Sequence, residues 1–158
     1  MKIPKRLKAI AELIPRGTRL LDVGTDNALL PVWLVLNGVI DSAIAADISP
    51  KCVARAEETV RNYQAEGKVT CVVSDGIEAI GGDAFDIAVI AGIGGENIRG
   101  IVEASLGKIR GKRLILQPQT KHMELLNFLR ANGFAIVFER VVYERGRVYL
   151  IQVAELLR

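Results

Sequence analysis

The feature that most constrains the fold is an apolar segment that ends in an acidic residue and a glycine turn and leads directly into a helical pattern. Residues 19–23 are expected to form a strand, with Asp22 near its end, Gly24 in the turn and a helix over 27–37. In an open parallel sheet, the carboxyl end of such a first strand is where ligands bind. The chain is therefore expected to form an α/β sheet with a binding site at this edge.

Two further carboxylates end apolar segments in the same way. Asp47 closes the expected strand 42–47 and lies twenty-three residues after Gly24, the usual distance for a group that accepts hydrogen bonds from ribose hydroxyls. Asp75 follows the expected strand 68–73, where its carboxylate can accept a hydrogen bond from an adenine amino group. Three acidic strand ends in this order predict a ligand that contains adenosine.

The glycine pattern bears on which adenosine ligand binds. A dinucleotide site needs the pattern G-x-G-x-x-G, but only Gly24 is present, and Asp26 and Leu29 stand where the other two glycines belong. A carboxylate at Asp26 would repel a diphosphate, which disfavours NAD. S-adenosylmethionine carries positive charge and no phosphate, so Asp22 and Asp26 favour it as the cofactor.

The remaining pattern alternates helices and strands to the end of the chain. An opening helix is expected within residues 1–15, and the further expected elements are helices 50–66, 95–107 and 121–132 and strands 85–91, 112–117, 134–143 and 147–154. Only residues 144–146 join the last two strands, which predicts an antiparallel hairpin over 134–154. A mostly parallel seven-stranded sheet with a C-terminal antiparallel strand is the layout of class I (Rossmann-like) S-adenosylmethionine-dependent methyltransferases. We expect residues 1–158 to form a single domain of this α/β class.

Composition excludes several other classes of protein. No apolar run is long enough to span a membrane, and the basic N-terminus leads into an amphipathic segment, so a cytoplasmic protein is expected. Cys52 and Cys71 show no paired spacing, and His122 is the one histidine, so no metal site is expected.

The first nineteen residues are strongly basic although the net charge is only +3. This segment contains one acidic residue, Glu12, and six basic residues, Lys2, Lys5, Arg6, Lys8, Arg16 and Arg19. Such a cluster attracts a phosphate backbone, but it is also typical of the solvated face of an amphipathic helix. The charge pattern alone leaves both interpretations open.

A second glycine-rich corner spans residues 90–96, after the expected strand 85–91. Its small residues would leave room for a substrate beside the cofactor, which makes Gly94 and Gly95 candidate substrate contacts. Gln117 ends the next strand with an amide that is placed to contact a base or a ribose.

These motifs together resemble the bacterial TrmK family of tRNA (adenine-N1)-methyltransferases. The resemblance rests on segments that occur in the family's order along nearly the whole chain: residues 4–7, 14–17, 21–26, Ala28, 30–31, 90–95 and 113–118. It implies methylation of the adenine at tRNA position 22, with S-adenosylmethionine as cofactor and tRNA as partner.

The resemblance also implies roles for individual residues. Asp26 and Asn27 are the expected catalytic residues, with Asp26 accepting hydrogen bonds from the adenine amino group. The expected cofactor contacts are Asp22, Gly24, Asp47, Ile48, Asp75, Gly76, Ala91 and Gly92. The expected substrate contacts are Gly94, Gly95, Gln117, Lys5 and Arg6.

Two features of the chain differ from the family pattern. Asn27 and Leu29 replace a histidine and a tyrosine beside the expected methyl group, and the family's C-terminal helical extension has no counterpart before Arg158. We therefore expect weaker tRNA binding. A methyltransferase for a small molecule or protein, or a non-catalytic S-adenosylmethionine-binding relative, stays open as an alternative.

Overall fold

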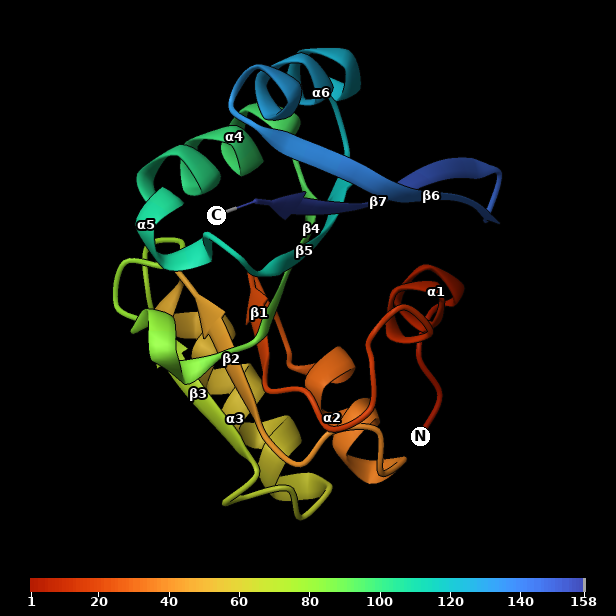
Figure 1. Ribbon diagram of the computed structural model, residues 1–158. Helices are drawn as coiled ribbons and strands as arrows, with labels where there is room; N and C mark the ends of the chain where they lie inside the picture. The colour runs from red at the N-terminus through yellow and green to blue at the C-terminus, as the bar shows by residue number, and fades with distance from the viewer. Residues whose placement is uncertain (158) are drawn as a thin grey trace.

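A computed structural model of the protein describes residues 1–157 and contains one seven-stranded sheet (Figure 1). The strand order is β3-β2-β1-β4-β5-β7-β6, with β1 Leu20–Val23, β2 Ala43–Asp47, β3 Val69–Val73, β4 Ile87–Ile93, β5 Arg113–Pro118, β6 Phe134–Glu144 and β7 Arg147–Leu156. Strands β3, β2, β1, β4 and β5 pair in parallel, and β7 pairs antiparallel with both β5 and β6. The expected mostly parallel sheet with a C-terminal antiparallel strand is confirmed.

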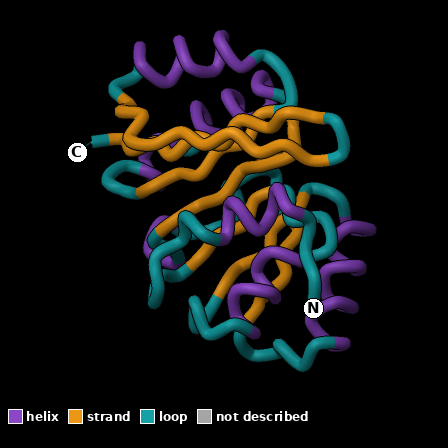
Figure 2. Tube along the Cα trace, turned by 90° about the vertical axis from the view of Figure 1, so that its right-hand side faces the viewer, coloured by secondary structure: helices purple, strands orange, loops and turns teal. Residues whose placement is uncertain are grey.

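Helices cover both faces of the sheet, as Figures 1 and 2 show. Their bounds are α1 Lys5–Ala11, α2 Leu29–Leu36, α3 Pro50–Asn62, α4 Gly95–Ala104, α5 Leu106–Ile109 and α6 His122–Ala131, with a short 3-10 turn at Gly82–Ala84. Alternate strand residues point to opposite faces, so Leu20 packs in the core beneath α1, α2 and α3, whereas Leu21 packs in the core beneath α4, α5 and α6. Because both faces are covered, the central strands are mostly apolar, with polar residues near their ends.

The first helix is shorter than the expected range of 1–15. Pro4 lies immediately before it in an extended conformation, and after Ala11 the chain continues in single turns toward Pro15. A proline disfavours helical geometry in the residue before it and has no backbone N–H to donate, which explains the early end.

Two other helices end earlier than the sequence pattern predicts. In α3, Gln64 adopts the left-handed conformation and the Ala65 N–H donates to the Val60 carbonyl at 2.9 Å, so a C-terminal cap closes the helix before residue 66. The expected helix 95–107 is interrupted at Ser105, which separates α4 from α5.

Strand β4 runs two residues farther than the expected 85–91. Its pairing with β5 shifts register between Ala91 and Ile93, and Gly92 has φ of +77° within this bulge. The glycine therefore continues the strand through an irregularity where other residues would be strained.

The C-terminal hairpin is confirmed and extends to Leu156. Its two-residue turn places Arg145 at φ +50° and Gly146 at φ +75°, the left-handed geometry that tight hairpins require. The turn lies at the same edge of the sheet as the carboxyl ends of the parallel strands, because β7 begins there.

None of the helices among residues 1–157 has both the length and the apolar character to cross a membrane.

Candidate binding site at the carboxyl edge of the sheet

The loop after β1 is held in an unusual backbone conformation. Gly24, Asp26 and Ala28 all have positive φ, at +74°, +57° and +59°. The Gly24 and Thr25 N–H groups both donate to the carbonyl of Ala46 in β2, at 2.8 and 2.9 Å. A left-handed conformation is costly for residues other than glycine, so Asp26 and Ala28 store strain at this point. Such strain is typical of a functional loop.

Asp47 fixes the loops at the end of β2. Its Oδ2 accepts the Asp26 N–H at 2.9 Å and its Oδ1 accepts the Ser49 N–H at 3.0 Å. A carboxylate oxygen has two acceptor sites, so each oxygen of Asp47 keeps one for a ligand hydroxyl.

Asp22 is buried directly behind this edge. Thr25 Oγ1 donates to its Oδ2 at 2.8 Å. Burial raises the pKa of Asp22 to about 6, against the opposing effects of the Thr25 hydrogen bond and the charge of Arg6. Above pH 6 the carboxylate is charged, so it contributes negative potential to the site from behind.

The turn after β3 is rigidly held. The buried Ser74 donates from Oγ to the Gly76 carbonyl at 2.9 Å and accepts the Ala79 N–H at 3.1 Å. The Lys108 ammonium donates to the carbonyls of Ile77 and Glu78. These contacts fix the backbone around Asp75, and the exposed Asp75 carboxylate is available to accept hydrogen bonds from a ligand.

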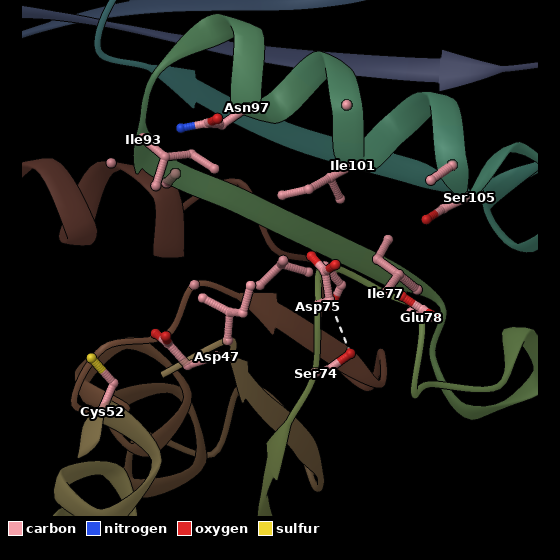
Figure 3. A pocket seen from close by; sticks show the side chains of 18 of the residues that line it. Asp47, Cys52, Ser74, Asp75, Ile77, Glu78, Ile93, Asn97, Ile101 and Ser105 are labelled. Atoms are coloured by element: carbon pink, nitrogen blue, oxygen red, sulfur yellow. Dashed lines mark hydrogen bonds between the residues drawn. The ribbon is translucent and has the colours of Figure 1, made fainter. Parts of the chain in front are cut away.

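The ends of β1, β2 and β3, together with the end of β4 at Ala91–Ile93, surround a cavity of about 1050 Å³. Figure 3 shows Asp47 and Cys52 on one side, Asp75 and Ser74 in the middle, and Ile101 pointing in from α4. The charged residues that line it are Asp26, Asp47, Asp75, Glu78, Glu96 and Lys108, and the ammonium of Lys108 is engaged by the two carbonyls. The cavity is thus predominantly negative.

This chemistry fits a nucleoside ligand that carries positive charge. Carboxylate acceptors at Asp47 and Asp75 match ribose hydroxyls and an adenine amino group, and the apolar side chains of Ile77 and Ile101 match a flat base. The same set of carboxylates would repel a diphosphate.

Most expected cofactor contacts lie in this cavity. Those that line it are Gly24, Asp47, Ile48, Asp75, Gly76, Ala91 and Gly92, together with Asp26 from the expected catalytic pair. A side chain added at Gly24 would meet no atom within 4 Å, so this glycine leaves open space at the end of β1. Asp22 lies behind the wall, and Asn27 is half-buried outside the lining.

Gly94 and Gly95, the expected substrate contacts at the glycine corner, pack closely against neighbouring atoms. An added Cβ on Gly95 would lie 2.4 Å from the carbonyl oxygen of Thr120, and one on Gly94 would lie 2.9 Å from the Glu96 carboxylate. Gly95 lets the start of α4 pack against the loop after β5, and Gly94 is the N-cap residue of that helix. Contact of Gly94 and Gly95 with the substrate stays a prediction.

Gln117, another expected substrate contact, lies inside the protein in this structure. Its side chain is fully buried, and every polar atom bonds within the protein: Oε1 accepts from Arg6 Nη1 and from the Gly92 N–H, both at 3.1 Å, and Nε2 donates to Pro118 and Gln119. An amide at a strand end can point inward, and this one joins α1 to the bulge of β4. Lys5 and Arg6 lie outside the cavity lining, but an added Cβ on Gly92 would be 3.7 Å from Arg6 Nη1.

One wall of the cavity was missed by sequence reasoning. It comes from α4, α5 and nearby residues, namely Ile93, Glu96, Asn97, Gly100, Ile101, Ala104, Ser105 and Lys108. Asn97, Gly100, Ile101 and Ala104 recur at helical spacing directly after the glycine corner, and this periodicity is the signal that identifies the wall.

Across residues 1–157, no three side chains of the metal-binding types gather into a possible ion site.

Comparisons with known proteins agree with this architecture. A family model described as a methyltransferase domain matches residues 3–152. The tRNA (adenine(22)-N(1))-methyltransferase of Bacillus subtilis is 36% identical over 156 residues, which cover 98% of this chain and 66% of that protein. The chain thus spans about two thirds of the length of this relative.

Solved structures give the same result. A Streptococcus pneumoniae protein in complex with S-adenosyl-L-methionine superposes with a TM-score of 0.95 at 37% identity, over 99% of this chain and 74% of that one. Mycoplasma capricolum TrmK in complex with S-adenosyl-homocysteine superposes with a TM-score of 0.88 at 26% identity, over 100% and 72%.

Proposed function

The chain belongs to the TrmK family of tRNA methyltransferases, and from this membership we propose that it methylates N1 of the adenine at tRNA position 22, with S-adenosylmethionine as the methyl donor. The observation that carries the proposal is the negative cavity at the ends of β1, β2, β3 and β4, in which carboxylates stand at the points where an adenosine and a positively charged group need them. As a tRNA-modifying enzyme it would work in the cytoplasm.

The cofactor side of the proposal follows the order of the strands. Asp47 accepts hydrogen bonds from the ribose hydroxyls while it holds the Asp26 and Ser49 amides, so ligand binding and loop geometry depend on one carboxylate. Asp75 accepts from the adenine amino group, with Ile77 and Ile101 beside the ring. Gly24 and Gly92 leave space beside the reacting end. Bound S-adenosylmethionine supplies an electrophilic methyl group.

Methyl transfer to the target adenine requires the site to orient the base and does not require a strong base. N1 of adenine carries an unprotonated lone pair at neutral pH, so the site has to hold and desolvate the base. Asp26 is the proposed catalytic residue: its carboxylate lines the cavity, and while Oδ1 accepts from Arg55 Nη2 at 2.8 Å, it retains acceptor sites for the amino hydrogens of the target base. Its charge also offsets the positive charge of the methylated ring. Asn27 stands next to it as a weaker acceptor.

Because N1 lies on the Watson-Crick edge, the base must be unpaired when it reacts.

The experiment is methyl transfer from labelled S-adenosylmethionine to tRNA from a strain that lacks the modification, followed by mapping of the product nucleoside. The expected product is N1-methyladenosine at position 22, lost when guanine replaces that adenine. Incorporation into a small molecule or protein, or cofactor binding without turnover, would instead support one of the alternatives and contradict the proposal.

Asp26→Ala tests the assignment within the site. Turnover should fall by more than about tenfold while S-adenosylmethionine binding persists, because the lost contacts are to the base. Asp41→Ala, which removes an exposed carboxylate outside the cavity lining, is the matched control and should leave both unchanged. Equal loss of turnover and cofactor affinity would show that Asp26 serves the cofactor.

A further inference from the structure

The turn end of the β6–β7 hairpin is fastened to the first turn of α1. The Glu144 carboxylate accepts the backbone N–H of Lys5 at 2.9 Å and that of Arg6 at 3.2 Å. Figure 1 shows α1 beneath the part of the hairpin that extends past the rest of the sheet. Two segments that are more than 130 residues apart in sequence are thus joined at the tip of the hairpin, which we call the hairpin surface and define by Lys5, Lys8, Tyr143, Arg145, Arg147 and Val148. Strand alternation puts the Glu144–Arg147 pair on the hairpin face toward α1 and the Tyr143–Val148 pair on the opposite face.

The hairpin surface carries an excess of positive charge. Lys5, Lys8, Arg145 and Arg147 are exposed, and none of them forms an ion pair within residues 1–157. The nearby acidic groups are already engaged, because Glu144 holds the α1 amides and Glu12 pairs with Arg140 at 2.8 Å. The surface therefore suits a polyanion.

Apolar side chains lie exposed on the hairpin face that points away from α1. Tyr143 is 67% exposed and pairs directly across the ladder with Val148, which is 61% exposed. An exposed aromatic ring beside a turn that carries two arginines offers a face on which an unstacked base packs while the arginines hold phosphates. This combination favours RNA over a protein partner, whose interface would bury a broader apolar area with fewer free charges.

A continuous set of contacts joins the hairpin surface to the cavity. Arg6, whose backbone N–H is bound by Glu144, donates from Nη1 to Gln117, and the same Gln117 oxygen accepts the N–H of the cavity-lining Gly92. The Arg6 guanidinium also lies 5.8 Å from the ring centre of Tyr149 in β7. Glu144, Arg6 and Gln117 thus connect the hairpin to the cavity wall at Gly92, so RNA bound at the hairpin surface would lie near the cavity.

We propose that the hairpin surface docks the RNA that carries the target base, with Arg145 and Arg147 contacting phosphates and Tyr143 stacking on an unpaired base. This inference rests on the proposed function, since it names the surface by which the same site receives its substrate. It assigns substrate binding to the C-terminal hairpin, where the sequence pattern indicated only secondary structure.

The test compares the full chain with the double variant Arg145→Asn/Arg147→Gln. Asparagine tolerates the left-handed backbone at position 145, so the turn is preserved. We expect the Kd and KM for tRNA to rise about tenfold, kcat to stay within about twofold, and the salt dependence of binding to weaken by one to two units of log–log slope. S-adenosylmethionine affinity should not change.

The matched control is Arg61→Gln/Arg130→Gln, which removes two exposed arginines on α3 and α6. If the hairpin variant binds tRNA no worse than this control, the inference is overturned. If the unaltered chain methylates no tRNA but its tRNA binding still depends on Arg145 and Arg147, the proposed function fails and the docking surface stands.

Tyr143→Ser tests the stacking contact and the competing protein interface. We expect a several-fold rise in KM for tRNA with an unchanged molar mass in light scattering. A variant that instead shifts from a dimer to a monomer while its KM is unchanged would show that this surface binds a second copy of the chain, which overturns the inference.

Discussion

The two edges of the sheet use the same kinds of charged residue in opposite ways. At the amino edge, charges satisfy one another: the Arg19 guanidinium donates to both oxygens of Asp86 and to the Asp83 carbonyl, and Arg113 donates twice to Glu155. The hydrogen bonds and the charge of Arg19 lower the pKa of Asp86, because they stabilise its ionised form.

At the carboxyl edge, the carboxylates lack such partners. Asp22 is buried with only a threonine hydroxyl in hydrogen-bonding contact, and Asp47 holds two backbone amides. Among the cavity-lining carboxylates of residues 1–157, only Asp26 has an ion pair, to Arg55, and both side chains are more than half exposed. Strain gathers at the same edge, in the left-handed Asp26 and Ala28. One edge therefore stabilises the sheet, whereas the other keeps negative charge available for a ligand.

The largest effect is expected from Asp47→Ala. S-adenosylmethionine affinity should fall about 100-fold or more, because the variant loses the ribose acceptors and leaves the Asp26 and Ser49 amides without their acceptor. Isothermal titration calorimetry measures this. Asp86→Ala, the equivalent change at the amino edge, should leave the affinity unchanged, and an equal loss in both variants would remove the distinction between the edges.

A smaller effect is expected from Gly92→Ala, with Gly17→Ala as its match. Both glycines have φ of +77° and both have room for a methyl group, so the two variants should lose similar stability, about 1–2 kcal/mol. Only Gly92→Ala should also reduce turnover, by about tenfold, because it displaces the bulge beside Arg6 and Gln117. Thermal unfolding and initial rates separate the two outcomes, and similar activity in both variants would show that the bulge plays no part in the reaction.

Asp22→Asn should stabilise the folded chain and weaken its binding of S-adenosylmethionine. The pKa of Asp22 is raised to about 6 in the folded chain, so its charged form opposes folding above pH 6 and this cost disappears as pH falls toward the ordinary value of 3.8. We expect the variant to be more stable at pH 7.5 by at most about 3 kcal/mol, with the gain shrinking toward pH 4, and to bind S-adenosylmethionine several-fold more weakly.

Denaturant unfolding across this pH range gives the stability, and calorimetry at pH 7.5 gives the affinity. A variant that is less stable than the original chain at pH 7.5 would contradict the account of Asp22 as a buried carboxylate retained for the ligand.

The smallest effect is expected from Asp86→Asn at the amino edge. The Arg19–Asp86 pair is about half exposed, so water and salt screen it and the melting temperature should fall only slightly. Because the pKa of Asp86 is lowered on folding, its contribution is present above the ordinary carboxylate pKa and is lost as pH falls through the lowered value. The melting temperatures of chain and variant should differ at pH 7 and converge as the pH is lowered well below 3.8, and methyl transfer should not change. A loss of activity would link the amino edge to the site.

Much of this organisation is predictable from the sequence because it follows from periodicity. Apolar runs that end in Asp22, Asp47 and Asp75 define three strands and the edge where they finish, and the short link at residues 144–146 requires an antiparallel pair. The carboxyl ends of parallel strands meet in space, so the cavity-lining residues at the ends of β1, β2 and β3 could be predicted from strand order alone.

The remaining features depend on contacts between distant segments. From the sequence alone, Gly94 and Gly95 fit an open cavity as well as they fit close packing against Thr120. Only the fold shows that the Gln117 side chain points inward to Arg6 and Gly92. The left-handed backbone at Asp26 is imposed by hydrogen bonds to β2, which local sequence preference does not predict.

The central claim is that the carboxyl edge selects a positively charged nucleoside and rejects a diphosphate. Calorimetric titration of the purified chain with S-adenosylmethionine and, separately, with NAD tests it most directly. The account predicts saturable binding of S-adenosylmethionine that weakens in Asp47→Ala, and no measurable heat of binding from NAD. Binding of NAD at this site, with S-adenosylmethionine unbound, would contradict it.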